Sequence, residues 1–400
     1  MRIYRCCFVP RAVRYSVLCA LTLAVMSCGV SRTEENASAD KPVTFKVEPA
    51  PEWTALFNRG DGWFGGDGIF AIPLNGVDAG ESDSVLFVFS DTMFGQIENG
   101  TLKPGYTMVN NSIMYLKGET PAAENASFLV NESKGEPHTL FIPTTAKRGK
   151  DDYYWLGDGF VNGTADGTMY IFAYRIRNTD DGSDFPFMEV GNNVIAIPKG
   201  SKYPFADHRQ LDLPFSEEND SLATSFGVGV LSDKESEDGF VYVYGVRGKS
   251  KELVAARVKA DKFEDFTSWE FLASEGWQRD AHLAIALSDS VSNELSVSPM
   301  GDGKYALIYQ YGGLLPTIYM QVGPSPVGPF GERMKVWNTA DDITEPELFT
   351  YNAKAHPAIS RPGELLVSYN VNSFKFHDVI EKMPNLYRPR FVRIVFTEKQ

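Results

Sequence analysis

Short runs of β-branched and aromatic residues recur along almost the whole chain, and this feature restricts its fold most. Gly, Pro, Asn and Asp separate the runs, and helical periodicity is nearly absent. The runs lie at 84–90, 167–176, 192–198, 239–247, 251–259, 304–312, 317–323, 363–371 and 389–397. We therefore expect an all-β protein without long helices, in which residues 259–272 hold about one helical turn.

The runs form a loose repeat of five units. Each unit has a short strand headed by a polar residue or Gly, a hydrophobic strand, a polar loop and another hydrophobic strand. The units begin near Gly65, Trp155, Thr224, Asn293 and Ala355. One such small sheet cannot bury both faces alone, whereas sheets packed radially can. The repeat predicts a five-bladed β-propeller over residues 51–400.

In a propeller the innermost strands converge on a central axis, so the residues that head them meet at one end. The sequence places Asp67, Asp158, Phe226, Glu294 and His356 at these points. For each residue alone, a role in forming a turn explains its presence about as well as a functional role does. Together, three carboxylates and a histidine predict a functional mouth.

The predicted mouth suits glycoside hydrolysis, which needs one carboxyl group as proton donor and another as nucleophile or base. A third carboxylate can keep the proton on the donor. We expect Asp67, Asp158 and Glu294 to fill these roles. Asp91, at the end of VLFVFSD, is a further catalytic candidate; its alternative role is that of an Asx-turn residue.

Aromatic and polar residues lie near the predicted strand starts, as in the stretch GDGWFGGDGIF at 60–70. Sugar rings pack their C–H faces on flat side chains, while their hydroxyl groups bind polar ones. A single tryptophan here is more often propeller packing, but the clustering favours a sugar site. The candidate substrate-binding residues are Trp63, Phe64, Asn111, Trp155, Trp277, Arg279, Tyr311 and His356.

Other chemistries find little support in the sequence. GxSxG and HExxH are absent, and no Cys follows Cys28, so we expect no thiol or zinc catalysis, no resident metal and no cofactor. A calcium ion on the axis is the one metal that oxygen ligands there would suit. The net charge is −14, and it falls to about −18 without the four arginines of the leader, which disfavours nucleic acid and favours a neutral glycan partner.

The N-terminus predicts an export signal. Four arginines precede an apolar run at 15–26, and Val25-Met26-Ser27-Cys28 resembles the bacterial lipobox. We expect residues 1–27 to be a lipoprotein signal peptide, Cys28 to carry the lipid and residues 28–50 to form a flexible tether. The alternative is an ordinary signal peptide with an incidental Cys. The expected location is the outer membrane, on its periplasmic or surface face, with contact through the lipid anchor only.

The segments GGDGIFAIPL, LFVFSDTMFG, VNNSIMYL, WLGDG and NELSVSPMGDGKYALIYQ resemble five-bladed propeller lipoproteins of the Bacteroidetes. These are similar to a family once labelled unknown function that includes endo-D-arabinanases, and more distantly to the arabinanase and fructosidase propellers. The resemblance covers most of residues 52–397. It implies an axial carboxylate cleft and activity on a furanoside-containing glycan.

The resemblance also implies roles for single residues. It matches Asp67 and Asp158 to the acids of the first and second blades, Glu294 to the acid of a later blade, and Asp91 to the acid of an FGDT-like motif, with Ser90 where Gly is usual. In the arabinanase-like propellers the donor Glu heads the third blade, where this chain has Thr-Ser-Phe-Gly at 224–227.

Three functions follow from these patterns. The first is a lipid-anchored glycoside hydrolase that acts on a neutral glycan through paired axial carboxylates. The alternative is a non-catalytic glycan-binding lipoprotein of a polysaccharide-utilisation system, which works with other outer-membrane glycan-uptake proteins. The third is a scaffold propeller whose rim holds another outer-membrane protein. Two carboxyl groups roughly 5–10 Å apart in one cleft would favour hydrolysis.

Overall fold

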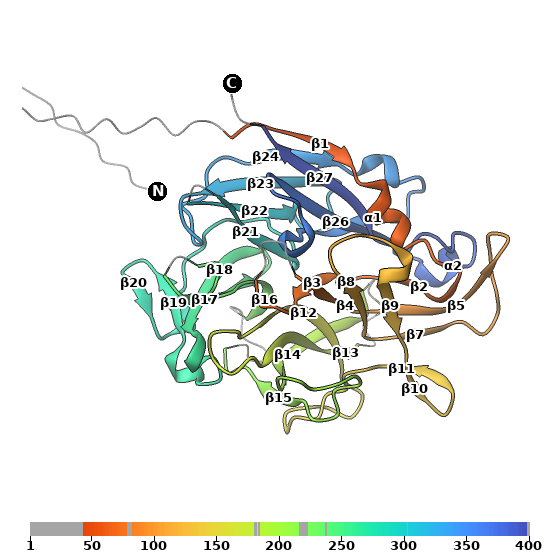
Figure 1. The fold of residues 1–400 in the computed structure, drawn as a ribbon, viewed down its shortest axis with the longest axis horizontal. Coiled ribbons are helices and arrows are strands. Elements are labelled where there is room, and N and C mark those ends of the chain that lie inside the picture. Colours follow the sequence, from red (N-terminus) through yellow and green to blue (C-terminus); the bar gives the residue numbers. More distant parts are fainter. Residues whose placement is uncertain are drawn as a thin grey trace, which may run out of the picture. The chain divides into compact units, whose positions relative to one another are not determined.

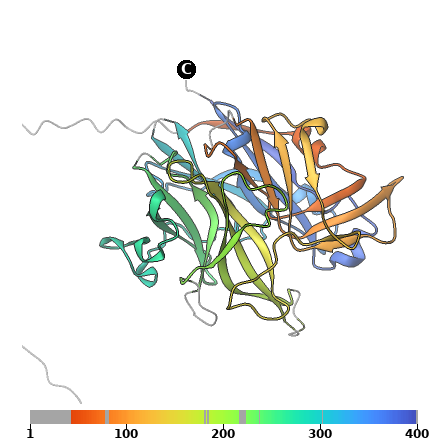
Figure 2. The ribbon, with the colours of Figure 1, turned by 60° about the horizontal axis from the view of Figure 1, so that its bottom comes forward.

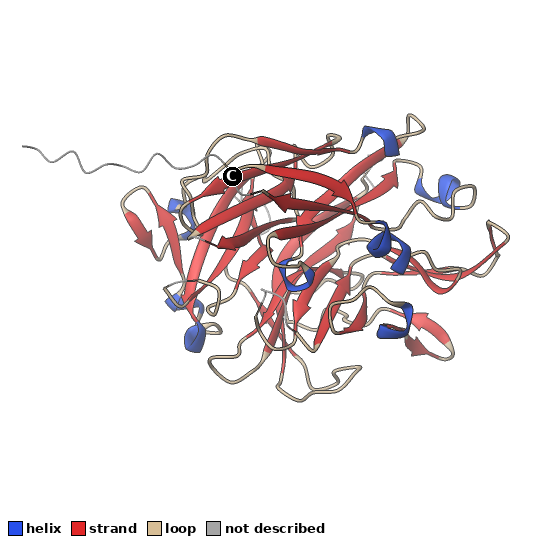
Figure 3. Ribbon diagram, turned by 45° about the horizontal axis from the view of Figure 1, so that its top comes forward, coloured by secondary structure: helices blue, strands red, loops and turns tan. Residues whose placement is uncertain are grey.

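The computed structural model describes residues 43–77, 82–179, 182, 185–215, 223–236, 238–301 and 303–397. Strands dominate the described chain, and its helices are short (Figure 3). The predictions for the leader, for Cys28 and for residues 28–42 of the tether lie outside the described residues. Within the described ranges, no helix is long and apolar enough to cross a membrane.

Most strands belong to five antiparallel sheets whose members follow one another along the chain. The first is β3 (Phe70–Pro73), β4 (Ser84–Phe89), β8 (Ser112–Lys117) and β9 (Ala126–Leu129). The second is β12 (Tyr153–Val161), β13 (Met169–Asn178), β14 (Phe187–Ile197) and β15 (Arg209–Asp212). The third is β16 (Thr224–Leu231), β17 (Phe240–Arg247), β18 (Glu252–Lys259), β19 (Glu270–Ala273) and β20 (Gly276–Gln278). The fourth is β21 (Leu295–Gly301), β22 (Lys304–Gln310), β23 (Thr317–Gly323) and β24 (Met334–Asn338). The fifth is β25 (Leu348–Ala355), β26 (Glu364–Ser373), β27 (Arg390–Phe396) and β1 (Phe45–Pro49).

The remaining elements are a further small sheet, one pair of strands and short helices. A further sheet joins β2 (Asp61–Gly66), β5 (Thr92–Glu98), β6 (Thr101–Leu102) and β7 (Thr107–Val109), and β10 (Asn131–Ser133) pairs with β11 (Glu136–His138). The α-helices are α1 (Pro51–Leu56) and α2 (Phe376–Ile380). The 3-10 turns are η1 (Ala123–Asn125), η2 (Ala260–Lys262), η3 (Phe266–Ser268), η4 (Ala281–Leu283), η5 (Ala340–Asp342) and η6 (Pro357–Ile359). Two of these turns, η2 and η3, occupy the segment where helical structure was expected.

The first strand of each sheet lies beside the first strand of the next. β3 contacts β12, β12 contacts β16, β16 contacts β21, and β21 contacts β25. In Figure 1 β3, β12, β16 and β21 lie near the middle of the folded unit, whereas β15, β20, β24 and β1 lie toward its edge. Figure 2 shows the second and third sheets, yellow-green and green, side by side. The arrangement is all-β and consistent with a β-propeller.

Apolar side chains fill the spaces between consecutive sheets. One buried cluster joins the first and second sheets, and three more join the second to the third, the third to the fourth and the fourth to the fifth. A fifth cluster packs Phe87 of β4 against Leu366 of β26 and Phe391 of β27, so the last sheet also meets the first. Because each sheet is covered on both faces, nearly continuous hydrophobic strands are stable here.

Two predictions about the ends of elements are wrong. The expected tether at 28–50 includes β1, which pairs with β27 from Phe45↔Phe396 to Pro49↔Val392. Phe45 and Val47 pack on the core between the fourth and fifth sheets, and this alternating pattern is too short to stand out in the sequence. His356 does not head the last innermost strand, because it directly follows β25. A bulge and several polar residues hide the strand signal of Leu348–Ala355.

Candidate active site

Bulges shape three of the innermost strands near the predicted mouth. The register shifts at Leu156/Gly159 in β12, at Phe226/Gly229 in β16 and at Tyr351/Lys354 in β25. A bulge leaves one residue unpaired and re-aims the side chains beside it. A Cβ at Gly157 would lie 2.7 Å from both the Gly227 carbonyl oxygen and the Tyr174 hydroxyl, so these strands approach too closely for any side chain there.

Asp67 and Asp91 form the first acidic pair of the site. Asp67 connects β2 to β3, Asp91 connects β4 to β5, and the Asp67 N–H donates to the Asp91 carbonyl at 3.2 Å. The Tyr351 hydroxyl donates to Asp67 Oδ2 at 2.5 Å. Trp155 Nε1 and Asn110 Nδ2 both donate to Asp91 Oδ1, at 3.0 and 3.3 Å. Side chains from the second and fifth sheets therefore hold the two carboxyl groups of the first.

The surroundings of Asp67 and Asp91 change the pKa values of the two carboxyl groups. Burial raises the pKa of Asp67, while the hydroxyl groups of Tyr351 and Tyr387 and the charge of Lys354 oppose the rise. Burial, followed by the negative charge of Asp67, raises the pKa of Asp91 to about 7. The negative charge of an ionised Asp67 therefore favours the protonated form of Asp91.

A buried ammonium group lies among the other predicted acids. The Lys354 side chain is 1% exposed, and its Nζ forms an ion pair with Glu294 Oε2. Burial raises the pKa of Glu294 to about 7; Lys354 opposes this, and the charges of Asp67 and Asp158 add to it. Lys354 also lowers the pKa of Asp67 and Asp158 against the effect of burial. The structure thus brings Asp67, Asp158 and Glu294 within electrostatic reach of one cation.

Asp158 differs from the other acids because backbone groups occupy both of its oxygens. The N–H of Gly159 donates to Oδ1 at 2.8 Å, and the N–H of Val230 donates to Oδ2 at 2.7 Å. The carboxyl group therefore ties β12 to β16. Burial still raises its pKa to about 7.

Glu189 is an acid of this site that the sequence reasoning missed. It lies on β14, and the Ser225 hydroxyl donates to its Oε2 at 2.5 Å. Burial raises the pKa of Glu189 to about 7. Both Glu189 and Glu294 raise the pKa of Tyr174, after burial of its ring, so both acids lie within electrostatic reach of Tyr174. A lone acid between Met188 and Val190 was the only available signal.

Several predicted substrate contacts are wrong because the side chains are buried in the core. Trp63 is 1% exposed and packs against Phe57, Phe89 and Phe128. Phe64 and Asn111 are fully buried, and the Asn111 amide bonds the backbone of β12 and of Phe141. The stretch at 60–66 forms strand β2 against β5 instead of a turn at the mouth, which explains this burial.

His356 is also wrong as a substrate contact. Its Nε2 bonds the Ser368 hydroxyl at 2.7 Å, and its ring lies 6.0 Å from Phe391. Burial, with the charge of Lys354, lowers the pKa of His356 well below its ordinary range, so the ring is neutral. His356 and Asp158 line a cavity of about 20 Å³ between the innermost strands, which has room for roughly one water molecule.

The other predicted contacts divide between the edge and the mouth. Trp277 and Arg279 lie at the outer edge of the third sheet, where Trp277 stacks on Arg257 at 4.1 Å and Arg279 bonds the Thr267 carbonyl. They are wrong, because β20 is the strand farthest from β16. Trp155 contacts Asp91 directly, as described above. Tyr311 follows β22 at the end where Leu295 pairs with Tyr309, so it lies at the end near Glu294 and stays a prediction.

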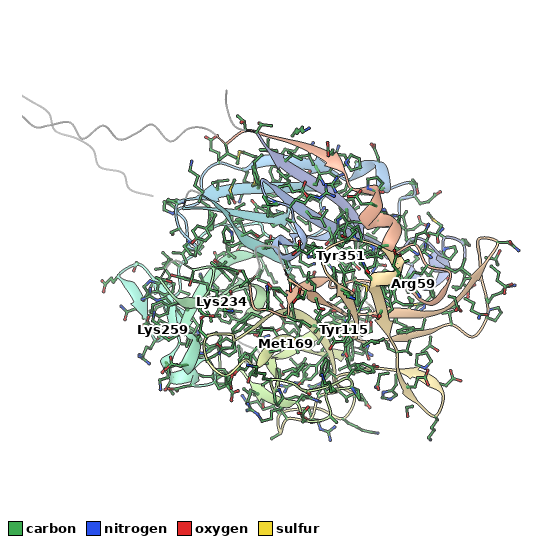
Figure 4. All side chains as sticks on the ribbon, viewed as in Figure 1. Arg59, Tyr115, Met169, Lys234, Lys259 and Tyr351 are labelled. Atoms are coloured by element: carbon green, nitrogen blue, oxygen red, sulfur yellow. The ribbon has the colours of Figure 1, made fainter. Side chains whose placement is uncertain are left out.

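No metal site emerges from the described part of the chain, in which no group of three or more His, Cys, Asp or Glu side chains is placed to hold an ion. The cation that lies among the acids is the Lys354 ammonium group, shared between Glu294, Asp67 and Asp158. Figure 4 labels Tyr351, which lies in the inner part of the ribbon, whereas Lys259 at the end of β18 lies near its edge.

Comparison with known proteins gives a family and a shared fold. Residues 51–396 match the family model described as "Domain of unknown function (DUF5005)". A Bacteroides ovatus ATCC 8483 protein, described as a candidate hydrolase, superposes with a TM-score of 0.68 at 21% identity, over 90% of this chain and 97% of that one. No functionally curated protein matches the sequence.

Two enzymes give weaker superpositions. An α-L-arabinofuranosidase of glycoside hydrolase family 43 from Clostridium thermocellum ATCC 27405 has a TM-score of 0.42 at 13% identity, over 81% of this chain and 87% of that one. An exo-β-1,3-galactanase from Phanerochaete chrysosporium has a TM-score of 0.46 at 9% identity, over 82% and 60%.

Proposed function

This chain belongs to the DUF5005 family, a domain family of unknown function, and we propose that it is a glycoside hydrolase whose acid pair is Asp67 and Asp91. The observation that carries the proposal is the unequal environment of these two neighbouring carboxyl groups. The negative charge of Asp67 favours the protonated form of Asp91, and the two roles of a glycosidase pair require one carboxylate and one protonated acid.

The geometry suggests which group does what. Trp155 and Asn110 both donate to Asp91 Oδ1, so Oδ2 is the oxygen that carries the proton. Asp91 gives this proton to the leaving glycosidic oxygen. Asp67, held by the Tyr351 hydroxyl, attacks the anomeric carbon or takes a proton from the water that does. Water is consumed, and each product gains a hydroxyl group.

Asp158 and Glu294, also expected as catalytic acids, are proposed to act on the charge of the cleft. The Asp158 oxygens are occupied by two backbone N–H groups, and Glu294 is occupied by Lys354. Lys354 affects the pKa values of both Glu294 and Asp67, and the charge of Asp67 affects that of Glu294. The Lys354–Glu294 ion pair therefore helps to set the pKa values of the site.

The proposal includes a five-bladed propeller, which the order of the sheets and the packing of the last against the first support. We further propose a neutral, furanoside-containing glycan as substrate. The family resemblance supports the furanoside, and the negative charge of the chain disfavours anionic sugars. The leader and the resemblance to the lipobox support lipid anchoring at Cys28 in the outer membrane, beside other glycan-uptake proteins.

A non-catalytic glycan-binding role is the second candidate. It is favoured by the stretch Thr-Ser-Phe-Gly at 224–227, which stands where the arabinanase-like propellers carry their donor Glu. Release of reducing sugar from arabinan, arabinogalactan and fructan distinguishes the two. We expect turnover by the wild type and a loss of about 10³-fold or more in Asp67→Asn, since an amide can be neither nucleophile nor base. Binding without turnover by the wild type would support the second candidate.

The pH dependence provides a second test. Asp91 must be protonated, so the rate should fall as the pH rises through about 7. Asp67 must be ionised, so the rate should also fall as the pH is lowered through the pKa of Asp67. Because burial raises this pKa, the fall should occur at a higher pH than for an ordinary Asp. A rate that keeps rising above pH 8 would contradict the role of Asp91.

A further inference from the structure

We propose that a continuous row of aromatic side chains beside the acid pair is the binding surface for a neutral oligosaccharide. This aromatic row consists of Trp155, Phe187, Phe185, Phe374, Phe349 and Tyr351. It deepens the proposed function, on which it rests for the position of the bond that is cleaved. Five of its members were not predicted from the sequence.

Each ring of the row contacts the next. The centroid distances are 4.6 Å from Trp155 to Phe187, 5.9 Å from Phe187 to Phe185, 5.6 Å from Phe185 to Phe374, 4.6 Å from Phe374 to Phe349, and 5.3 Å from Phe349 to Tyr351. Trp155 belongs to β12, Phe187 to β14, and Phe185 to the loop before β14. Phe349 and Tyr351 belong to β25, and Phe374 directly follows β26. The row therefore connects the second sheet to the fifth.

Both ends of the row are hydrogen-bonded to the acid pair. Trp155 donates to Asp91 at 3.0 Å, and Tyr351 donates to Asp67 at 2.5 Å. The row thus begins at one carboxyl group and ends at the other. A chain molecule that lies on its rings would be held beside both reacting groups.

The middle of the row is exposed. Phe185 is 40% exposed and Phe374 is 41% exposed, although each packs against other rings. Exposed aromatic side chains that are gathered next to a polar site indicate a binding surface, because exposing them to water is unfavourable. The stabilisation gained by covering two such rings is available to a ligand.

Polar groups beside the row favour a sugar over a purely apolar ligand. Asn372 donates to the Tyr351 hydroxyl at 3.1 Å, and the hydroxyl of Tyr153, whose ring contacts Trp155, donates to Asn178 at 3.0 Å. Ring faces with amide and hydroxyl groups at their edge match the C–H faces and hydroxyl groups of a sugar. The nearby carboxylates disfavour a uronic acid polymer, so the ligand is neutral.

Electrophoresis through gels that contain arabinan, galactan, fructan or the anionic polymer polygalacturonate tests the row without needing turnover. We compare the wild type, Asp67→Asn, Phe185→Ala, Phe374→Ala and a matched control, Leu315→Ala, whose side chain is 51% exposed but lies outside the row. At least one neutral polymer should retard the wild type, Asp67→Asn and the control. Each Phe→Ala variant should bind about fivefold to tenfold more weakly, as lost ring contacts predict.

The outcomes separate this inference from the proposed hydrolase. Unchanged retardation of both Phe→Ala variants, retardation of the wild type by polygalacturonate alone, or no retardation by any neutral polymer would each overturn the aromatic row. Retardation that the Phe→Ala changes weaken, without turnover by the wild type, would support the row and overturn the hydrolase. Turnover with an unchanged KM in both Phe→Ala variants would support the hydrolase and overturn the aromatic row. Urea unfolding of each variant excludes a general loss of folding.

Discussion

Replacing Lys354 by Met tests the electrostatic arrangement on which the site depends. The Lys354 side chain is 1% exposed and that of its partner Glu294 is 12% exposed, so water screens this ion pair little. Lys354 also lies 4.5 Å from the centre of the Phe70 ring. Met keeps most of the apolar volume and removes the charge.

The expected loss of stability is large. Removing one partner of a buried ion pair leaves an uncompensated charge and typically costs about 3–5 kcal/mol. Without the ammonium group, the pKa values of Glu294, Asp158 and Asp67 rise further. A raised pKa in the folded protein contributes stability that is complete below the unfolded value of about 4 and is lost as the pH rises. The deficit should therefore be larger at pH 8 than at pH 5.

Urea unfolding followed by tryptophan fluorescence measures this effect at both pH values. The double variant Lys354→Met/Glu294→Gln is the matched control, because it removes both charges and should recover all but about 1–2 kcal/mol. A single variant that loses less than about 1 kcal/mol at pH 8 would refute the reasoning. So would a deficit that is equal at pH 5 and pH 8, or a double variant no more stable than the single one.

Three further predictions concern the acid pair, the close approach of strands and the fifth sheet. Asp91→Asn should abolish turnover yet stabilise the folded protein, by about 1–3 kcal/mol at pH 8 and less at pH 4, because the pKa of Asp91 in the wild type is raised to about 7. Thermal unfolding at both pH values measures this change in stability, and an equal change at both would contradict the prediction. Gly157→Ala should lower the stability by about 2 kcal/mol or more in urea, because its Cβ would lie 2.7 Å from the Gly227 carbonyl oxygen, whereas Gly331→Ala, with its nearest atom at 3.5 Å, should change little. Deleting residues 43–49 should lower the Tm by several degrees through loss of the β1 ladder and of the buried surface of Phe45, and an unchanged Tm would contradict this.

The sequence predicts the strands and the convergence of distant acids well. Runs such as 84–89 and 240–247 are hydrophobic at nearly every position because each sheet is covered on both faces, and this leaves a strong local signal. Asp67, Asp158 and Glu294 could be placed at one site because the order of strands within each unit repeats. Their meeting follows from topology alone.

What the sequence could not provide is the direction of individual side chains. Alternation fails at a bulge, so nothing local shows that Lys354 points at Glu294, 60 residues away, or that Tyr351 reaches Asp67, 284 residues away. Trp63, in the stretch GDGWFGGDGIF, is predicted to bind a sugar, but the pairing of β2 with β5 buries its side chain. Phe185 and Phe374 are unremarkable in the sequence, because only the tertiary structure brings them together.

The pairing of β1 with β27 has a consequence for biosynthesis. The segment Phe45–Pro49 leaves the ribosome hundreds of residues before its partner Arg390–Phe396, so the seam between them cannot form until nearly the whole chain has been made. Until then both segments have unpaired edges that invite association with other chains. The fifth sheet is therefore complete only when the last strand of the chain is available.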